Sequence, residues 1–88
     1  MATKDKLNIK NYPNPANEYT NFEFYALGGE VQINIFDNTG KLVDSIKNQH
    51  LQEGMQTLFY DTHSLKSGNY YYQVLQHNGS ATGHLLKL

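Results

Sequence analysis

Histidine, aspartate and paired glycine are the residue types of this chain that could support catalysis or metal binding. No two of the histidines stand two or four residues apart, the spacing that places two metal ligands on one face. Cysteine is absent, which excludes a disulfide, a thiolate nucleophile and a cysteine-ligated zinc site. The sequence therefore predicts no metal site and no cofactor. The histidines are His50, His63, His77 and His84.

The carboxylates and glycines also lack a catalytic arrangement. Asp37, Asp44 and Asp61 lie near the ends of predicted strands, where aspartate usually accepts local backbone hydrogen bonds. No loop has the dense oxygen ligands of a calcium site, and Gly28-Gly29 does not open a helix as a phosphate loop would. No serine stands in a nucleophile elbow. We predict a protein without catalytic residues and without a small-molecule substrate.

Length and charge restrict the remaining classes. A chain of 88 residues with 39% hydrophobic residues can bury one small core, so we expect one domain. Seven basic and eight acidic residues give a net charge of -1, which argues against nucleic acid or an anionic membrane surface as partner. No segment is apolar and long enough to span a membrane, and Met1 to Lys10 lack the apolar core of a signal peptide.

The elements that must position any functional residue are strands, because apolar residues alternate with a period of two and no helical spacing competes. Turn residues recur about every 8 to 12 residues, as in antiparallel sandwiches. We predict an all-β, seven-stranded antiparallel sandwich of the immunoglobulin-like or fibronectin-like kind. The expected strands are Leu7 to Asn11, Thr20 to Tyr25, Val31 to Asp37, Lys41 to Ile46, Gln56 to Asp61, Asn69 to Leu75 and Ala81 to Lys87.

Several turns follow from residue chemistry. Asn78-Gly79 is predicted to occupy the two central positions of a type I′ hairpin, because both residues tolerate positive φ. Gly40 is predicted to take the left-handed position of the turn before Lys41. Pro13 and Pro15 cannot donate to a strand ladder, so the first strand should end near Tyr12.

The alternation also predicts which side chains form the core. Phe59, Tyr71 and Leu75 should face outward, where the two aromatic residues form cross-strand pairs or, less favoured, a contact surface. The predicted inward residues are Phe22, Phe24, Val31, Ile33, Ile35, Leu58, Tyr60, Tyr70, Tyr72 and Val74.

A series of landmarks in this order resembles the type A C-terminal sorting domain of type IX secretion (Por secretion) cargo, a family of Bacteroidota. The resemblance begins at Tyr12-Pro13-Asn14-Pro15 and continues through Val31 to Asp37, the turn that follows, and Leu51. It covers the chain from about Leu7 to Leu88. The sorting-motif residues that it implies are Tyr12, Pro13, Asn14, Pro15, Gly40, Lys41, Gly54, Leu65, Gly68, Tyr70, Leu85, Leu86 and Lys87.

The resemblance implies a non-catalytic signal that directs a fused N-terminal cargo across the outer membrane. The implied partners are the type IX translocon and a sortase-like processing peptidase, which usually removes the signal. The precursor would pass through the periplasm and reach the cell surface or the medium. Residues 1 to 6 would then be a linker or an added start, residues 7 to 88 the sorting domain, and cleavage would fall at or before Lys6.

Three further expectations concern partners. The last strand, Ala81 to Lys87, is expected at or near a sheet edge, where a partner could read its backbone by strand addition. An alternative function is an accessory binding module of a secreted multidomain protein, which binds carbohydrate through Phe59 and Tyr71 or another protein. A structural assembly domain, similar to the sandwich of flagellar hook-capping proteins, is a further alternative.

Overall fold

The computed structural model describes residues 9–88. The expected linker, the expected cleavage position at Lys6 and the expected strand start at Leu7 lie outside these residues. Every regular element in the described range is a strand, and none of its residues forms a helix that could cross a membrane. The strands are β1 (Lys10–Tyr12), β2 (Tyr19–Ala26), β3 (Gly29–Asp37), β4 (Leu42–Leu51), β5 (Gly54–Asp61), β6 (Gly68–Gln76) and β7 (Gly79–Lys87).

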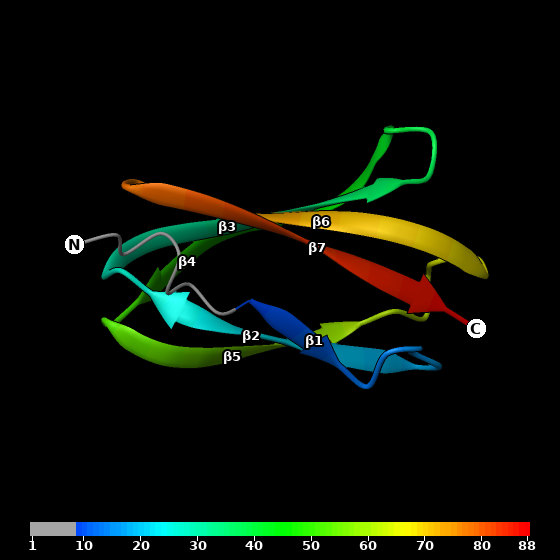
Figure 1. Ribbon diagram of the computed structural model, residues 1–88, viewed down its shortest axis with the longest axis horizontal. Coiled ribbons are helices and arrows are strands. Elements are labelled where there is room, and N and C mark those ends of the chain that lie inside the picture. The colour runs from blue at the N-terminus through cyan, green and yellow to red at the C-terminus, as the bar shows by residue number, and fades with distance from the viewer. Residues whose placement is uncertain (1–8) are drawn as a thin grey trace.

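Two antiparallel sheets pack face to face (Figure 1), as the predicted sandwich requires. The smaller sheet has the order β1-β2-β5 and the larger sheet has the order β4-β3-β6-β7. This arrangement confirms the predicted immunoglobulin-like or fibronectin-like fold. Ala16 adds an isolated parallel bridge to Lys87. With this bridging segment counted as a strand, the predicted count of seven is one short.

The core forms between the two sheets from alternating residues. Almost all of the predicted inward side chains are buried, and Leu58 packs against them half-buried. The ring of Tyr72 crosses its cross-strand partner Gly83 so closely that a Cβ there would lie 2.4 Å from the Tyr72 Cζ. Gly83 is therefore required by packing. Burial also includes residues outside the predicted set, namely Ala16, Thr20, Ala26, Thr62, Leu65, Leu85 and Lys87.

Strand β4 departs furthest from its predicted range, which ended at Ile46. Two bulges interrupt its pairing with β3, and the strand continues through polar residues to Leu51. It lies at the edge of the larger sheet, where exposed side chains need not alternate in polarity. Periodicity alone therefore missed its second half.

The hairpin between β6 and β7 differs by one residue from its prediction. Gln76 pairs with Gly79, so the two connecting residues are His77 and Asn78. The predicted Asn78-Gly79 centre is wrong because Gly79 already belongs to the ladder of β7. Gly40, in contrast, has a φ of 89°, which confirms its predicted left-handed conformation.

Candidate functional site

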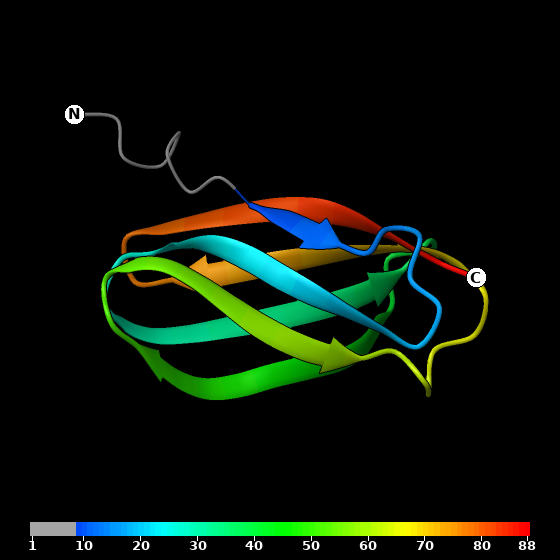
Figure 2. The ribbon, with the colours of Figure 1, turned by 90° about the horizontal axis from the view of Figure 1, so that it is seen from below.

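One end of the sandwich gathers nearly all of the residues that the resemblance marks as the expected sorting motif, and we call it the motif end. It contains residues 12–18, 38–41 and 62–70 and the last residues of β7 (Figure 2). The three connections at this end are long, whereas each connection at the opposite end has two residues. Gly54 is the exception, because it pairs with Ala26 at the opposite end.

The Pro-Asn-Pro segment lies along the outer edge of β7, and we call residues 14–16 the strap. The Asn14 amide donates to the His84 carbonyl at 3.1 Å, and its oxygen accepts from the Leu86 N–H at 3.0 Å. Ala16 N donates to Leu86 O at 2.7 Å, and Leu88 N donates to Ala16 O at 2.8 Å. The side chain of Asn14 thus takes the place of a strand backbone, and the strap covers the C-terminal half of this edge.

Residues on both sheets hold the chain around the strap. The Thr20 hydroxyl of β2 donates to the Pro13 carbonyl at 3.0 Å. The ammonium of Lys87, at the end of β7, donates to the Asn17 carbonyl, and Lys87 is only 8% exposed. Thr62 N donates to Glu18 O at 2.9 Å. The connection from β1 to β2 is therefore anchored to both layers of the sandwich.

A corner before β6 contains three more motif residues. Tyr70 is buried, and its hydroxyl donates to the Lys66 carbonyl at 2.6 Å, as in the tyrosine corner of other sandwiches. Leu65 is buried beneath the corner. Gly68 and Tyr70 pair with Lys87 and Leu85 in β7, and Leu85 is fully buried. Leu65, Tyr70 and Leu85 therefore contribute to the core.

The turn from β3 to β4 presents Lys41 at the same end. Asp37 closes this turn, because its Oδ1 accepts from the Thr39 hydroxyl at 2.6 Å and from the Lys41 N–H at 3.0 Å. The hydrogen bond from the Thr39 hydroxyl, followed by that from the Lys41 backbone, lowers the pKa of Asp37. This carboxylate is therefore a structural acceptor and not a poised base.

Metal-ligating side chains do not cluster in the part of the chain that the structure describes. Within residues 9–88, no group of three or more histidine, cysteine, aspartate or glutamate residues could hold a metal ion. His63 lies 3.4 Å from the Asp61 carboxylate, and both side chains are exposed. Burial, and then the hydrogen bond from its hydroxyl to Asp44, raises the pKa of Tyr60, which holds this phenol neutral.

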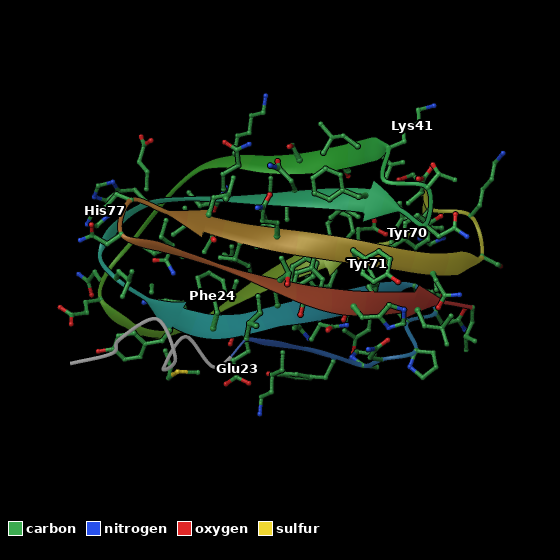
Figure 3. The ribbon with its side chains drawn as sticks, turned by 45° about the horizontal axis from the view of Figure 1, so that its top comes forward. Glu23, Phe24, Lys41, Tyr70, Tyr71 and His77 are labelled. Atoms are coloured by element: carbon green, nitrogen blue, oxygen red, sulfur yellow. The ribbon has the colours of Figure 1, made fainter. Side chains whose placement is uncertain are left out.

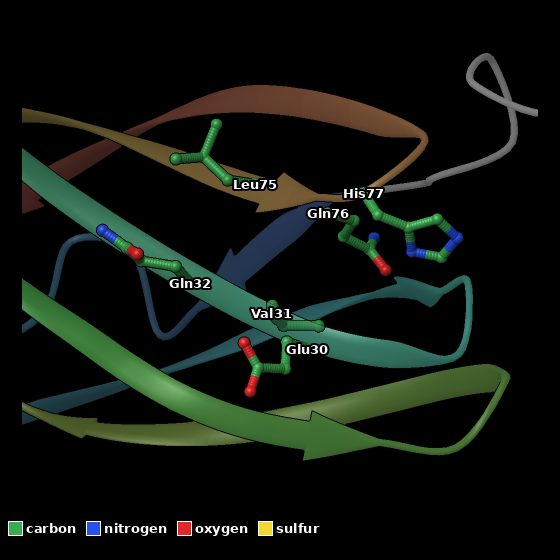
Figure 4. A pocket seen from close by; sticks show the side chains of 6 residues that line it. All are labelled: Glu30, Val31, Gln32, Leu75, Gln76 and His77. Carbon is green, nitrogen blue, oxygen red and sulfur yellow. The ribbon is translucent and has the colours of Figure 1, made fainter.

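A hollow lies at the opposite end of the sandwich, between β3 and the end of β6 (Figure 4). Its lining includes Glu30, Gln76 and His77 but no sorting-motif residue. The Gln76 side chain already accepts from Leu27 N at 2.7 Å and donates to Tyr25 O at 3.1 Å. The Gln76 side chain of this hollow thus ties the end of β2 to β6.

The exposed aromatic residues do not form one platform. Phe59 lies on the outer face of the smaller sheet and stacks on Tyr19 with 5.4 Å between ring centroids. Tyr71 lies on the outer face of the larger sheet and packs against its cross-strand neighbour His84. Cross-strand pairing therefore accounts for both rings, and their opposite placement removes the basis for a shared sugar-stacking surface.

Sequence reasoning missed the anchors of the strap. Thr20 continues the alternation of Phe22 and Phe24, so its inward direction could have been read from the strand pattern. Ala16 and Asn17 gave no such signal, because their partners lie about 70 residues away along the chain. These long-range contacts define how the motif end is assembled.

A family model described as the secretion system C-terminal sorting domain matches residues 4–87. No curated protein and no solved structure matches the chain significantly. The matched range includes every strand of the sandwich and all residues of the strap. The chain therefore belongs to the family of secretion system C-terminal sorting domains.

Proposed function

We propose that this domain directs a cargo fused to its N-terminal side across the outer membrane through the type IX secretion system. The family is a C-terminal sorting signal of that system, and such signals are generally non-catalytic. The exported product reaches the cell surface or the medium after passing through the periplasm. The translocon is the partner that reads the domain.

The observation that carries this proposal is the hydrogen bonding of the Pro-Asn-Pro segment to the edge of β7. Four hydrogen bonds join residues 14–16 to residues 84–88. Two landmarks from opposite ends of the sequence thus form one surface with fixed geometry. A receptor that binds this surface would select the folded domain and reject an unfolded chain that contains the same residues.

Strand addition by a partner is open to a shorter part of β7 than the sequence suggested. β7 is an edge strand, but the strap occupies the outward backbone groups of Leu86 and Leu88. By the alternation of an antiparallel strand, Ser80 and Thr82 also direct their backbone outward, away from β6. A partner strand would pair there, or it would have to displace the strap.

Removal of the domain by a sortase-like peptidase is the last part of the proposal. β1 lies at the edge of the smaller sheet and begins at Lys10. The pairing of Lys10–Tyr12 with β2 is therefore the first sheet contact within the described residues. Cleavage before that pairing would release the cargo and leave the sandwich intact.

An export assay tests the function. Residues 1–88 are fused behind a signal peptide and a fluorescent reporter, in a type IX-competent bacterium and in its translocon-deficient mutant. We expect reporter at the surface or in the medium of the competent strain, and retention in the periplasm of the mutant. The reporter without the domain controls for leakage. Periplasmic retention in both strains would refute the proposal.

A further inference from the structure

A groove of about 420 Å³ opens at the motif end between the β3–β4 turn and the β5–β6 corner. Lys41 and Val43 line it from one side, and Leu65, Lys66 and Tyr70 line it from the other. Figure 3 shows Lys41 and Tyr70 at the same end of the sandwich. Three of these five residues, Lys41, Leu65 and Tyr70, belong to the expected sorting motif. Packing in the core explains the presence of Leu65 and Tyr70 in that motif, but it does not explain Lys41.

Most polar groups around the groove already have partners. The Asp37 carboxylate accepts from Thr39 and Lys41, and the Tyr70 hydroxyl donates to the Lys66 carbonyl. The ammonium groups of Lys41 and Lys66 differ. Within the described part of the chain, no carboxylate lies within 4.0 Å of either of them. Asp37 also lines the groove, so two ammonium groups against one carboxylate leave the lining with an excess of positive charge.

Val43, Leu65 and Tyr70 supply apolar surface to the lining, beside the polar side chain of Ser64. Val43 is 39% exposed, and its neighbour along β4, Leu42, is 51% exposed. Leu65 and Tyr70 form the buried base. An exposed apolar patch rimmed by polar residues is typical of a surface that contacts another protein.

The geometry points to an acidic, extended peptide segment of the secretion machinery as the ligand of this groove. Its carboxylates would pair with Lys41 and Lys66, and an apolar side chain between them would lie on Val43 and Leu65. This inference rests on the proposed function and names the chemistry of the partner. Two lysines on a domain with a net charge of -1 are too few for a nucleic acid site, which supports a peptide.

Charge-reversed variants in the export assay give the first test. Lys41→Glu with Lys66→Glu should lower exported reporter by about tenfold, because like charges would oppose the incoming carboxylates. Lys41→Arg with Lys66→Arg should retain export. Lys47→Glu with Gln52→Glu and Asn78→Asp makes the same change in net charge away from the groove and should export normally. All of these side chains are exposed, so the urea midpoint of each variant should stay close to that of the parent.

The assay separates two kinds of failure. If the unaltered domain is not exported in a translocon-dependent manner, the proposed function itself is refuted, and the groove with it. If the unaltered domain is exported and the charge-reversed groove variant is exported equally well, only the groove proposal is refuted. Equal loss in the control with Lys47→Glu, Gln52→Glu and Asn78→Asp would also refute it, since the effect would then follow net charge.

A peptide titration tests the chemistry directly. The isotope-labelled domain is titrated with an acetylated, amidated Glu-Leu-Glu-Leu-Glu peptide, followed by amide chemical shifts. We expect shifts at Lys41, Val43 and Leu65, and weaker binding as salt rises from about 50 to about 500 mM because surface ion pairs are screened. A Lys-Leu-Lys-Leu-Lys peptide is the control. Equal binding of the basic peptide, or shifts outside the groove alone, would overturn the inference.

Discussion

The connections between strands differ in length and in stabilising contacts at the two ends of the sandwich. At the opposite end, two-residue connections join β2 to β3, β4 to β5 and β6 to β7. At the motif end the connections are longer, and contacts between segments far apart in the sequence hold them. Short connections need only local turn chemistry, whereas long ones must be fixed by tertiary contacts. Consequently the motif end depends on the complete fold, as the proposed recognition of the folded domain requires.

Core truncation at the two ends should give the largest difference. Leu85 is fully buried opposite Tyr70 at the motif end, and Leu85→Ala should lower the free energy of unfolding by about 2–5 kcal/mol. Leu75 is half-buried near the opposite end, and Leu75→Ala should cost about 1 kcal/mol or less. Urea denaturation followed by tyrosine fluorescence measures both values. Equal costs would show that the motif end is no more dependent on its core.

Alkaline pH should weaken the tie between β1 and β6. Burial raises the pKa of Tyr72 to about 12, and its hydroxyl donates to the Asn11 side chain at 2.9 Å. Because the pKa is higher in the folded state, this stability is complete below about pH 10 and falls as pH rises towards about 12, by roughly 2–3 kcal/mol. Urea midpoints from pH 7 to pH 12 measure the loss.

Two tyrosine variants identify the source of this alkaline loss. Tyr72→Phe should remove about half of the dependence, because burial also raises the pKa of Tyr60, which leaves a comparable loss in the same direction. Tyr71→Phe removes an exposed phenol and should leave the profile unchanged. A profile that Tyr72→Phe does not alter would exclude this phenol as its cause.

Two side-chain amides offer a matched comparison with smaller effects. Asn14 lies at the motif end and Gln76 at the opposite end, and each side chain makes two hydrogen bonds to backbone groups. Gln76 is half-buried and Asn14 is exposed, so Gln76→Ala should cost about 1–2 kcal/mol and Asn14→Ala about 1 kcal/mol. The larger cost follows from the buried partners that Gln76→Ala leaves unsatisfied.

Amide hydrogen exchange locates each effect. Asn14→Ala should speed exchange of the Leu86 N–H, which loses its acceptor, and leave Leu27 unchanged. Gln76→Ala should speed exchange of the Leu27 N–H and leave Leu86 unchanged. If Asn14→Ala left Leu86 protected, the strap would not depend on this side chain, and the union of the Pro-Asn-Pro segment with β7 would need another explanation.

The sequence by itself determined the all-β class, most of the core and the end of the first strand. Period-two alternation specifies which side chains face inward, and Pro13 and Pro15 limit β1, because both effects act over a few residues. The left-handed Gly40 followed from the same local chemistry. The order of these landmarks along the sequence also identified the family.

Only the tertiary structure decided which of these landmarks meet. Asn14 and Ala16 bind β7 across about 70 residues of sequence, and no local pattern specifies such a contact. Strand pairing also placed Phe59 and Tyr71 on opposite faces and put Lys41 beside Lys66. Alternation fixes the inward or outward direction of a side chain within its strand, but the sheet to which the strand belongs is set by long-range pairing.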